Sequence, residues 1–116
     1  KIMINVYMDD FRRVPLGFTL ARTTEECLIL LRDCEVDVLS LDHDMGPVDD
    51  NGSEVARLIV QEGLFPREIY LHTSSLWGRK EMYEMLYAAK PEGTLLHNGP
   101  MPQDKLEAIA AGDSIK

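Results

Sequence analysis

Short apolar runs alternate with amphipathic stretches along this chain. Five runs rich in apolar and β-branched residues predict strands, at residues 2–8, 18–21, 36–41, 69–71 and 94–96. Four stretches in which apolar residues recur at helical spacing predict helices, at residues 23–34, 53–62, 79–89 and 103–111. Residues 12–17 are too few for a full helix and contain Pro15 and Gly17, so we expect a turn or a single helical turn there.

Strands that alternate with helices predict βαβ units with right-handed crossovers and a parallel sheet. We therefore expect an α/β fold with three layers, a doubly wound parallel sheet of five strands in the order 2-1-3-4-5, and a first helix that is shortened or absent. The chain has 116 residues, a common domain size, so residues 1–116 are predicted to form one domain. Thr23 and Glu26 match a capping box at the start of the first predicted helix.

Composition and charge narrow the function classes. The chain is 45% hydrophobic and 28% charged, as in an ordinary soluble globular protein, and no apolar run is long enough to cross a bilayer. A formal net charge of −8 argues against broad coating of nucleic acid, whose backbone it would repel. It leaves room for one small anionic ligand held by a local group of arginines.

The two cysteines, Cys27 and Cys34, lie seven residues apart on one predicted helix. That spacing is about 10 Å along the helix axis, which is too far for a disulfide. We expect two reduced thiols in the core. Together with the absence of a basic-then-apolar signal sequence, they favour a cytoplasmic location.

Ionisable and hydroxyl side chains follow four of the predicted strands. They are Asp9 and Asp10, then Asp42, His43 and Asp44, then His72, Thr73 and Ser74, and finally His97 with Asn98. Ligands of an open parallel sheet bind outside the carboxyl ends of its strands. Because the chain's three histidines all lie at such ends, we expect them to converge on one edge of the sheet.

The carboxylates at this edge require compensation. Asp9, Asp10 and Asp42 cannot all stay ionised close together without a counter-charge. A Mg²⁺ ion bound by carboxylate oxygens is one solution, and a bound proton that turns one aspartate into a general acid is another. Arginine is the third solution, and Arg12, Arg13 and Arg79 are near the same edge in the sequence. The sequence leaves these alternatives open.

The histidines suggest acid–base chemistry. His43 and His72 follow adjacent strands and could serve the two ends of an in-line phosphoester displacement, one activating the attacking oxygen and the other protonating the leaving oxygen. Asp42 would assist them. Arg12 and Arg79 match a phosphate as forked donors. Thr73 and Ser74 could donate to phosphate oxygens or cap the following helix.

These stretches resemble the receiver domains of two-component signalling. "VYMDD" resembles the strand that ends in an acidic pair, and "DVLSLDHDMG" resembles the strand that ends in a phospho-acceptor aspartate, which would be Asp42. "IYLHTSS" resembles the strand that ends in a hydroxyl residue. Receivers carry a lysine after the fifth strand, whereas this chain has "LLHNGP" there, which argues against simple phospho-acceptance.

A more specific resemblance is to a receiver-like family named for cyclic-phosphate processing. It rests on Asp-Asp-Phe-Arg at residues 9–12, Ala-Arg-Thr at 21–23, "SLDHDMG" at 40–46, and "LHTSS" followed by Gly-Arg at 78–79. The resemblance implies a flavodoxin-like, receiver-like domain whose site residues are Asp9, Asp10, Arg12, Asp42, His43, Asp44, His72 and Arg79. His97 lies outside the pattern and is a secondary candidate.

The leading hypothesis is therefore a phosphate-handling domain that processes cyclic phosphates, either 2′,3′-cyclic nucleotides or RNA ends, by histidine-based acid–base chemistry. It would be a cyclic phosphodiesterase-type hydrolase whose partner is a small phosphorylated ligand or an RNA end. One alternative is a response-regulator receiver phosphorylated on Asp42. Another is an inactive receiver-like domain that binds only a nucleotide or a protein. The sequence predicts neither an oligomeric state nor whether Mg²⁺ is required.

Overall fold

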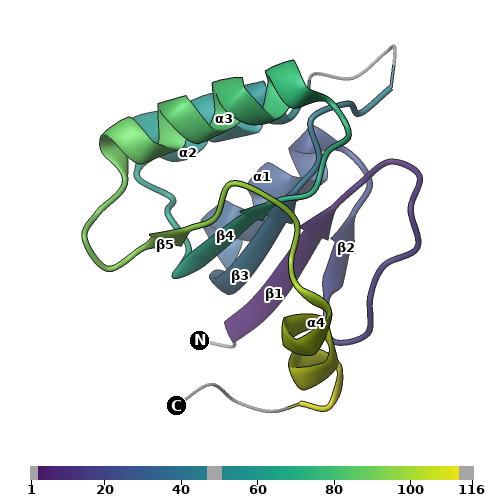
Figure 1. The fold of residues 1–116 in the computed structure, drawn as a ribbon. Coiled ribbons are helices and arrows are strands. Elements are labelled where there is room, and N and C mark those ends of the chain that lie inside the picture. The colour runs from purple at the N-terminus through teal and green to yellow at the C-terminus, as the bar shows by residue number, and fades with distance from the viewer. Residues whose placement is uncertain (1–2, 47–50, 113–116) are drawn as a thin grey trace.

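The strands of this protein form one parallel sheet, flanked by helices. The structure is a computed structural model that describes residues 3–46 and 51–112. The strands are β1 (Met3–Met8), β2 (Thr19–Ala21), β3 (Glu35–Leu41), β4 (Glu68–Leu71) and β5 (Leu95–Leu96). The helices are α1 (Thr24–Asp33), α2 (Gly52–Glu62), α3 (Leu76–Ala89) and α4 (Gln103–Ala110). The strand order is β2-β1-β3-β4-β5 with every pair parallel (Figure 1), which confirms the predicted doubly wound order.

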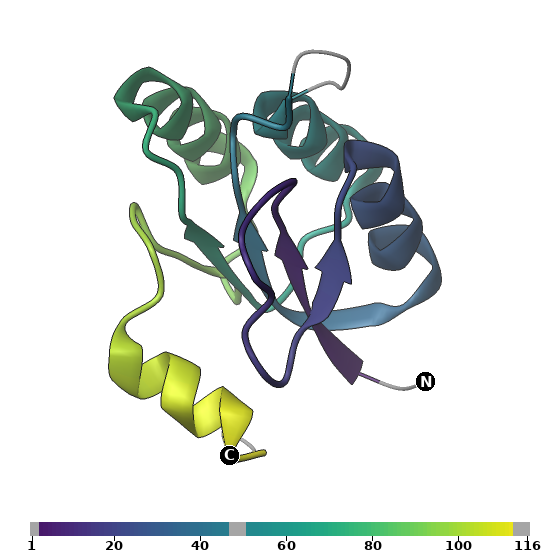
Figure 2. The same cartoon turned by 90° about the vertical axis from the view of Figure 1, so that its right-hand side faces the viewer.

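Helices cover the two faces of the sheet unequally. Figures 1 and 2 show α1, α2 and α3 along one face and α4 by itself on the other. The larger core joins those three helices to the β-strand side chains that face them, including Leu39, Leu41, Ile69 and Leu71. A smaller core joins α4 and the segment before it to Val38 and Tyr70. Since alternate residues of a strand point to opposite faces, Ser40 and Tyr70 lie on the α4 face.

No helix connects β1 and β2 within residues 9–18, as the short interval predicted. The α4 face of β1 is covered instead by side chains of the connection itself, where the rings of Tyr7 and Phe18 meet edge to face at 5.8 Å. This face of the sheet therefore carries aromatic and polar side chains in place of a helix-packed apolar surface.

Most predicted element ends are within one residue of the observed ends. Residue 2 of the first predicted strand lies outside the described residues. Thr23 caps α1 by accepting a hydrogen bond from the Glu26 backbone at 3.0 Å, while the Glu26 carboxylate accepts from the Arg22 backbone at 2.7 Å. Gly63 ends α2 in the left-handed conformation at φ 69°.

The predicted start of α3 at residue 79 was wrong, because the helix begins three residues earlier at Leu76. Ser75 caps it by accepting from the Gly78 backbone at 3.0 Å. The spacing of apolar residues did not indicate this first turn, because Leu76 and Trp77 are exposed and do not belong to the buried stripe of the helix. The earlier start brings the first turn of α3 over the end of β3.

Two further expectations concern the cysteines and the membrane. Both cysteines are free, and burial raises the pKa of the Cys27 thiol to about 12. This agrees with the prediction that they form no disulfide, but only Cys27 is in the core as predicted, because Cys34 is half-buried at the end of α1. Among the described residues, every helix is too short or too polar to cross a membrane.

Candidate functional site

His72 is the centre of a buried hydrogen-bonded group on the α4 face. It follows β4, and its Nε2 lies 3.0 Å from Asp9 Oδ2. Its Nδ1 lies 2.6 Å from Ser40 Oγ, and its ring stacks on Tyr7 with centroids 4.2 Å apart and planes inclined by 8°. Both ring nitrogens are therefore bonded and the ring is held in one orientation.

The environment sets the charges of this group. Burial lowers the pKa of His72 to about 4, although the hydrogen bond to Asp9 opposes the change, so the imidazole is neutral at neutral pH. Burial also raises the pKa of Asp9, but hydrogen bonds from the Arg12 and Phe11 backbones and from His72 outweigh it and leave that pKa below its usual value. A neutral ring that donates from Nε2 to ionised Asp9 and accepts the Ser40 hydroxyl proton at Nδ1 satisfies all three side chains.

Asp42 adds a second buried carboxylate at the end of β3. Its Oδ1 accepts a hydrogen bond from the His43 backbone at 2.8 Å. Burial and the neighbouring Asp9 charge raise the pKa of Asp42, which is the electrostatic conflict that the sequence indicated. Asp42 therefore holds a proton more readily than an exposed aspartate does.

One cluster of side chains fits a divalent cation. Ligand atoms of Asp9, Asp42 and His72 lie within 4.8 Å of one another. Two carboxylate oxygens and an imidazole nitrogen suit ions such as Mn²⁺ or Zn²⁺, which accept nitrogen ligands, and the carboxylates alone suit Mg²⁺. The structure does not bring Asp10 into this cluster. The Asp10 side chain is exposed and lies beside Gly46, where an added Cβ would be 3.3 Å from Asp10 Oδ2.

A pocket of about 260 Å³ opens beside His72 on the same edge of the sheet. Arg12 reaches across it, since its Nη1 donates to the His72 carbonyl at 2.8 Å and lies 3.4 Å from Asp9 Oδ2. The lining residues are Tyr7, Arg12, His72, Thr73, Ser74 and Pro100. Four residues that the sequence indicated for phosphate binding or acid–base chemistry thus share one pocket.

Three residues that support this pocket were missed at the sequence level. Arg22 donates from Nη1 to the backbone carbonyls of Asp9 at 3.1 Å and Arg12 at 2.8 Å, which ties the loop after β1 to the end of β2. Ser40 and Tyr7 bond and stack on His72. The alternation along β3 could have identified Ser40, because it lies two residues before Asp42 and shares its side of the strand.

His43 lies on the other side of the sheet edge, beneath α3. Its ring meets that of Trp77 edge to face at 5.9 Å, and its Nε2 is 4.0 Å from Glu81 Oε1. A Cβ built on Gly78 would lie 2.3 Å from the ring, so glycine is needed there for the ring to fit. The structure therefore does not bring His43 and His72 together as the expected acid–base pair, because the two rings pack against opposite layers.

His97 does not converge on this edge either. It stacks on Tyr70 at 4.1 Å, and its Nε2 lies 2.8 Å from Glu68 Oε2. Strand β5 is only two residues long, and the His97 backbone pairs with Ile69, which places the ring beside Tyr70, two residues before His72. The expectation that all three histidines share one site is not met.

Arg79 and Asp44, the remaining predicted site residues, lie away from the Asp9–His72 group. Arg79 is in the first turns of α3, half-buried, and does not line the pocket beside His72. Asp44 is exposed and accepts a hydrogen bond from the Gly46 backbone at 3.3 Å. Neither contacts the Asp9–His72 group in the described part of the chain.

The Glu68 carboxylate joins α4 to the sheet, and its ionisation should make folding pH-dependent. Burial raises its pKa, but hydrogen bonds from Tyr70, Lys105 and His97 lower it overall. A carboxylate whose folded pKa is lowered stabilises the fold above its unfolded pKa, and this stabilisation is lost as the pH falls through the folded value.

Glu68→Gln should therefore lower the free energy of unfolding by about 1–2 kcal/mol at pH 6 and by less at pH 3. Urea unfolding curves of both proteins at several pH values measure this difference. A gap between Glu68→Gln and the wild type that stays constant or widens toward pH 3 would contradict the role given to Glu68.

Comparison with known proteins supplies one match. A family model described as the cyclic-phosphate processing receiver domain matches residues 4–88, a range that runs from β1 to the end of α3. No curated protein and no solved structure matches the chain. The matched range includes Asp9, Arg12, Ser40, Asp42 and His72.

Proposed function

This chain belongs to the cyclic-phosphate processing receiver domain family, and from that membership we propose that it opens cyclic phosphodiesters in the pocket beside His72. The substrate class is a 2′,3′-cyclic phosphate on a nucleotide or on an RNA end. The product is a phosphomonoester that keeps the phosphate on one of the two ribose oxygens.

The pocket carries this proposal. It places a forked cation, Arg12, and two hydroxyl residues, Thr73 and Ser74, around a space of about 260 Å³. Guanidinium and hydroxyl donors match the non-bridging oxygens of a phosphate. His72 lines the same pocket and is bonded to Asp9 at 3.0 Å, so a phosphate bound there would be close to groups that can hold a proton.

The reaction needs one water and no other co-reactant. The water oxygen bonds to phosphorus and one ring P–O bond breaks. Water gives one proton to the site, and the site gives one proton to the leaving ribose oxygen, so no proton is gained or lost by the protein. We assign the proton transfers to the coupled group of Asp9, Asp42 and His72. Ser40 and Tyr7 would keep His72 oriented, and Arg22 would keep Arg12 and Asp9 in place.

A divalent cation is a further proposal for this site. Asp9, Asp42 and His72 would hold it, and Asp10, which we expected from the sequence, would not. When bound, such an ion compensates the carboxylate charges and polarises a phosphate oxygen.

Phosphorus NMR tests the proposed reaction directly. A 2′,3′-cyclic nucleotide is incubated with the protein in Mg²⁺, in Mn²⁺ and in chelator. We expect a monoester signal to replace the cyclic one, and its chemical shift will show which oxygen keeps the phosphate. Loss of turnover in chelator alone would assign the carboxylates to metal binding. An unchanged spectrum in every sample would overturn the proposed reaction and favour a domain that only binds.

Arg12→Ala should raise the KM for the cyclic nucleotide roughly tenfold, because a charge-assisted hydrogen bond to phosphate contributes about 1.5–3 kcal/mol. The neighbouring exposed residue gives a matched control, since Arg13 does not line the pocket and Arg13→Ala should keep the wild-type KM. Equal KM values for Arg12→Ala and the wild type would remove Arg12 from the phosphate site.

Phosphorylation of Asp42 is the competing function. Two observations disfavour it: the residues after β5 include no lysine before Pro100, and Lys105 binds Glu68 at 3.0 Å on the α4 face. Incubation with acetyl phosphate followed by intact-mass measurement separates the two functions. A stable adduct that Asp42→Asn abolishes would favour the receiver function.

A further inference from the structure

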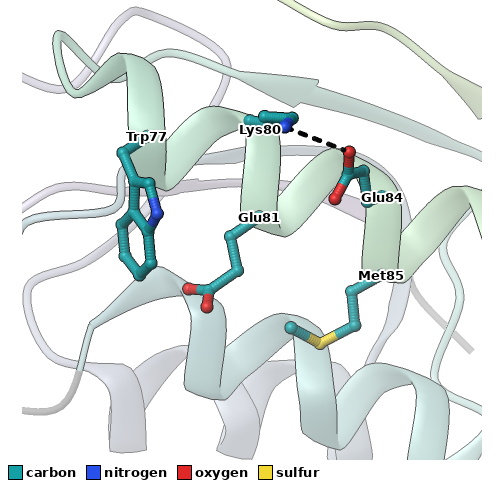
Figure 3. Close-up of a pocket in the computed structure, with 5 residues that line it drawn as sticks. All are labelled: Trp77, Lys80, Glu81, Glu84 and Met85. Carbon is teal, nitrogen blue, oxygen red and sulfur yellow. Dashed lines mark ion pairs between the residues drawn. The ribbon is translucent and has the colours of Figure 1, made fainter.

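A second concave site lies between α2 and α3, on the face of the sheet opposite the pocket beside His72. Two overlapping cavities of about 430 and 500 Å³ share Trp77, Glu81 and Met85 of α3. These residues are four apart, and Figure 3 shows their side chains directed to the same side of the helix, with Lys80 and Glu84 beyond them. We call this site the α2–α3 groove; on the α2 side it adds the capping residue Asn51 together with Ser53, Glu54 and Arg57 of the helix.

The α2–α3 groove is lined by three glutamates but by only one lysine and one arginine. Glu54 forms an ion pair with Arg57, and Glu84 lies 3.8 Å from Lys80. Glu81 accepts a hydrogen bond from the Ser53 hydroxyl but forms no ion pair with a lysine or arginine of the described residues. Its side chain is 37% exposed, so one carboxylate faces solvent without a counter-charge from lysine or arginine.

Next to this carboxylate is an exposed aromatic ring. Trp77 is 66% exposed although it is the largest apolar side chain of α3. Behind Glu81 lies the buried His43 Nε2, which has no hydrogen-bond partner among the described residues. An indole surface beside a carboxylate that has no lysine or arginine partner is an arrangement that suits organic cations.

We propose that the α2–α3 groove binds the guanidinium group of an arginine side chain presented by a partner protein. The flat guanidinium would stack on Trp77 while its forked N–H groups donate to Glu81. The compact ammonium group of lysine would make the stack on Trp77 and the hydrogen bonds to Glu81 less well than a guanidinium group. The net charge of −8 on the whole chain also favours the approach of a basic segment.

The α2–α3 groove is connected to the phosphate pocket through the residue after Asp42. His43 Nε2 lies 4.0 Å from Glu81 Oε1, and the His43 backbone N–H donates to Asp42 Oδ1 at 2.8 Å. The inference does not depend on the proposed reaction, because it concerns binding at a separate face and is tested without substrate.

Trp77 provides the measurement, because it is the only tryptophan of the chain. The full chain is titrated with a capped glycine–arginine–glycine amide and with the same peptide carrying citrulline, which keeps the shape but lacks the charge. We expect a saturable change in Trp77 fluorescence, with the arginine peptide binding about fivefold more tightly. Equal affinity for the two peptides would overturn the proposal.

Two matched variants test the role of Glu81. Glu81→Gln should abolish the preference for arginine over citrulline, whereas Glu84→Gln should keep it, since Glu84 is already paired with Lys80. Circular dichroism checks that both variants fold. A preference that survives in Glu81→Gln would overturn the assignment. So would an oligouridylate that changes Trp77 fluorescence when the arginine peptide does not, because the groove would then be an RNA surface.

Discussion

Replacing His72 by alanine is expected to lower the rate of cyclic-phosphate opening by about a hundredfold or more. The imidazole lines the pocket and is bonded to Asp9 through Nε2 at 3.0 Å. Alanine removes the ring that carries a proton and leaves the Asp9 carboxylate without its imidazole partner near Asp42. Initial rates from phosphorus NMR time courses measure the effect.

The His72→Ala protein should remain folded. Losing the stacked ring and its hydrogen bonds costs about 1–3 kcal/mol, which is less than the roughly 5–15 kcal/mol that typically stabilises a domain. His72→Gln provides a second variant that keeps polar atoms at this position. Circular dichroism and urea unfolding establish whether each variant is folded under the assay conditions.

His97→Gln is the matched control for His72. His97 also lies on the α4 face and also stacks on a tyrosine, but it binds Glu68 outside the pocket. We expect its rate to stay close to that of the wild type. Full activity in His72→Ala, or an equal loss in His97→Gln, would show that His72 has no specific part in the reaction.

Alanine at position 78 is expected to destabilise the fold by about 2–3 kcal/mol, even though alanine favours a helix over glycine by about 1 kcal/mol. A Cβ at Gly78 would lie 2.3–2.6 Å from atoms of the His43 ring. The ring cannot withdraw easily, because the His43 backbone is bonded to Asp42 and to Gly52. Urea unfolding followed by circular dichroism measures the change.

A second substitution tests the stated cause. His43→Ala in the Gly78→Ala background should recover much of the lost free energy, because it removes the ring that the new methyl group strikes. Gly93→Ala is the control, since a Cβ there would meet nothing within 4 Å. If the double variant is no more stable than Gly78→Ala, steric conflict with His43 is not the cause.

Local patterns were sufficient for most of the fold. The alternation Glu68-Ile69-Tyr70-Leu71-His72 predicts a strand with one apolar and one polar side, and the structure places Ile69 and Leu71 in the larger core and Tyr70 in the smaller one. The short interval before Phe18 predicted the missing helix. These features depend on residues close together in the sequence, so the sequence contains them directly.

The edge of the sheet was also predictable, but the direction of each side chain was not. Asp9 and Asp10 are adjacent, and only Asp9 turns toward His72, while Asp10 faces solvent. His97 could be placed beside Tyr70 only once the register of β4 and β5 was known. Register depends on pairing between strands that are far apart in the sequence.

By itself, then, the sequence determined the order of strands and helices and the carboxyl edge at which Asp9, Asp42 and His72 meet. Only the tertiary structure decided which atoms bond, His72 Nε2 with Asp9 and Nδ1 with Ser40, and that α3 covers His43. Alternation still assigns the first residue after a strand to one side of the sheet, as with Asp9, Asp42 and His72. Whether a side chain farther along has room depends on distant elements, as Gly78 leaves space for His43.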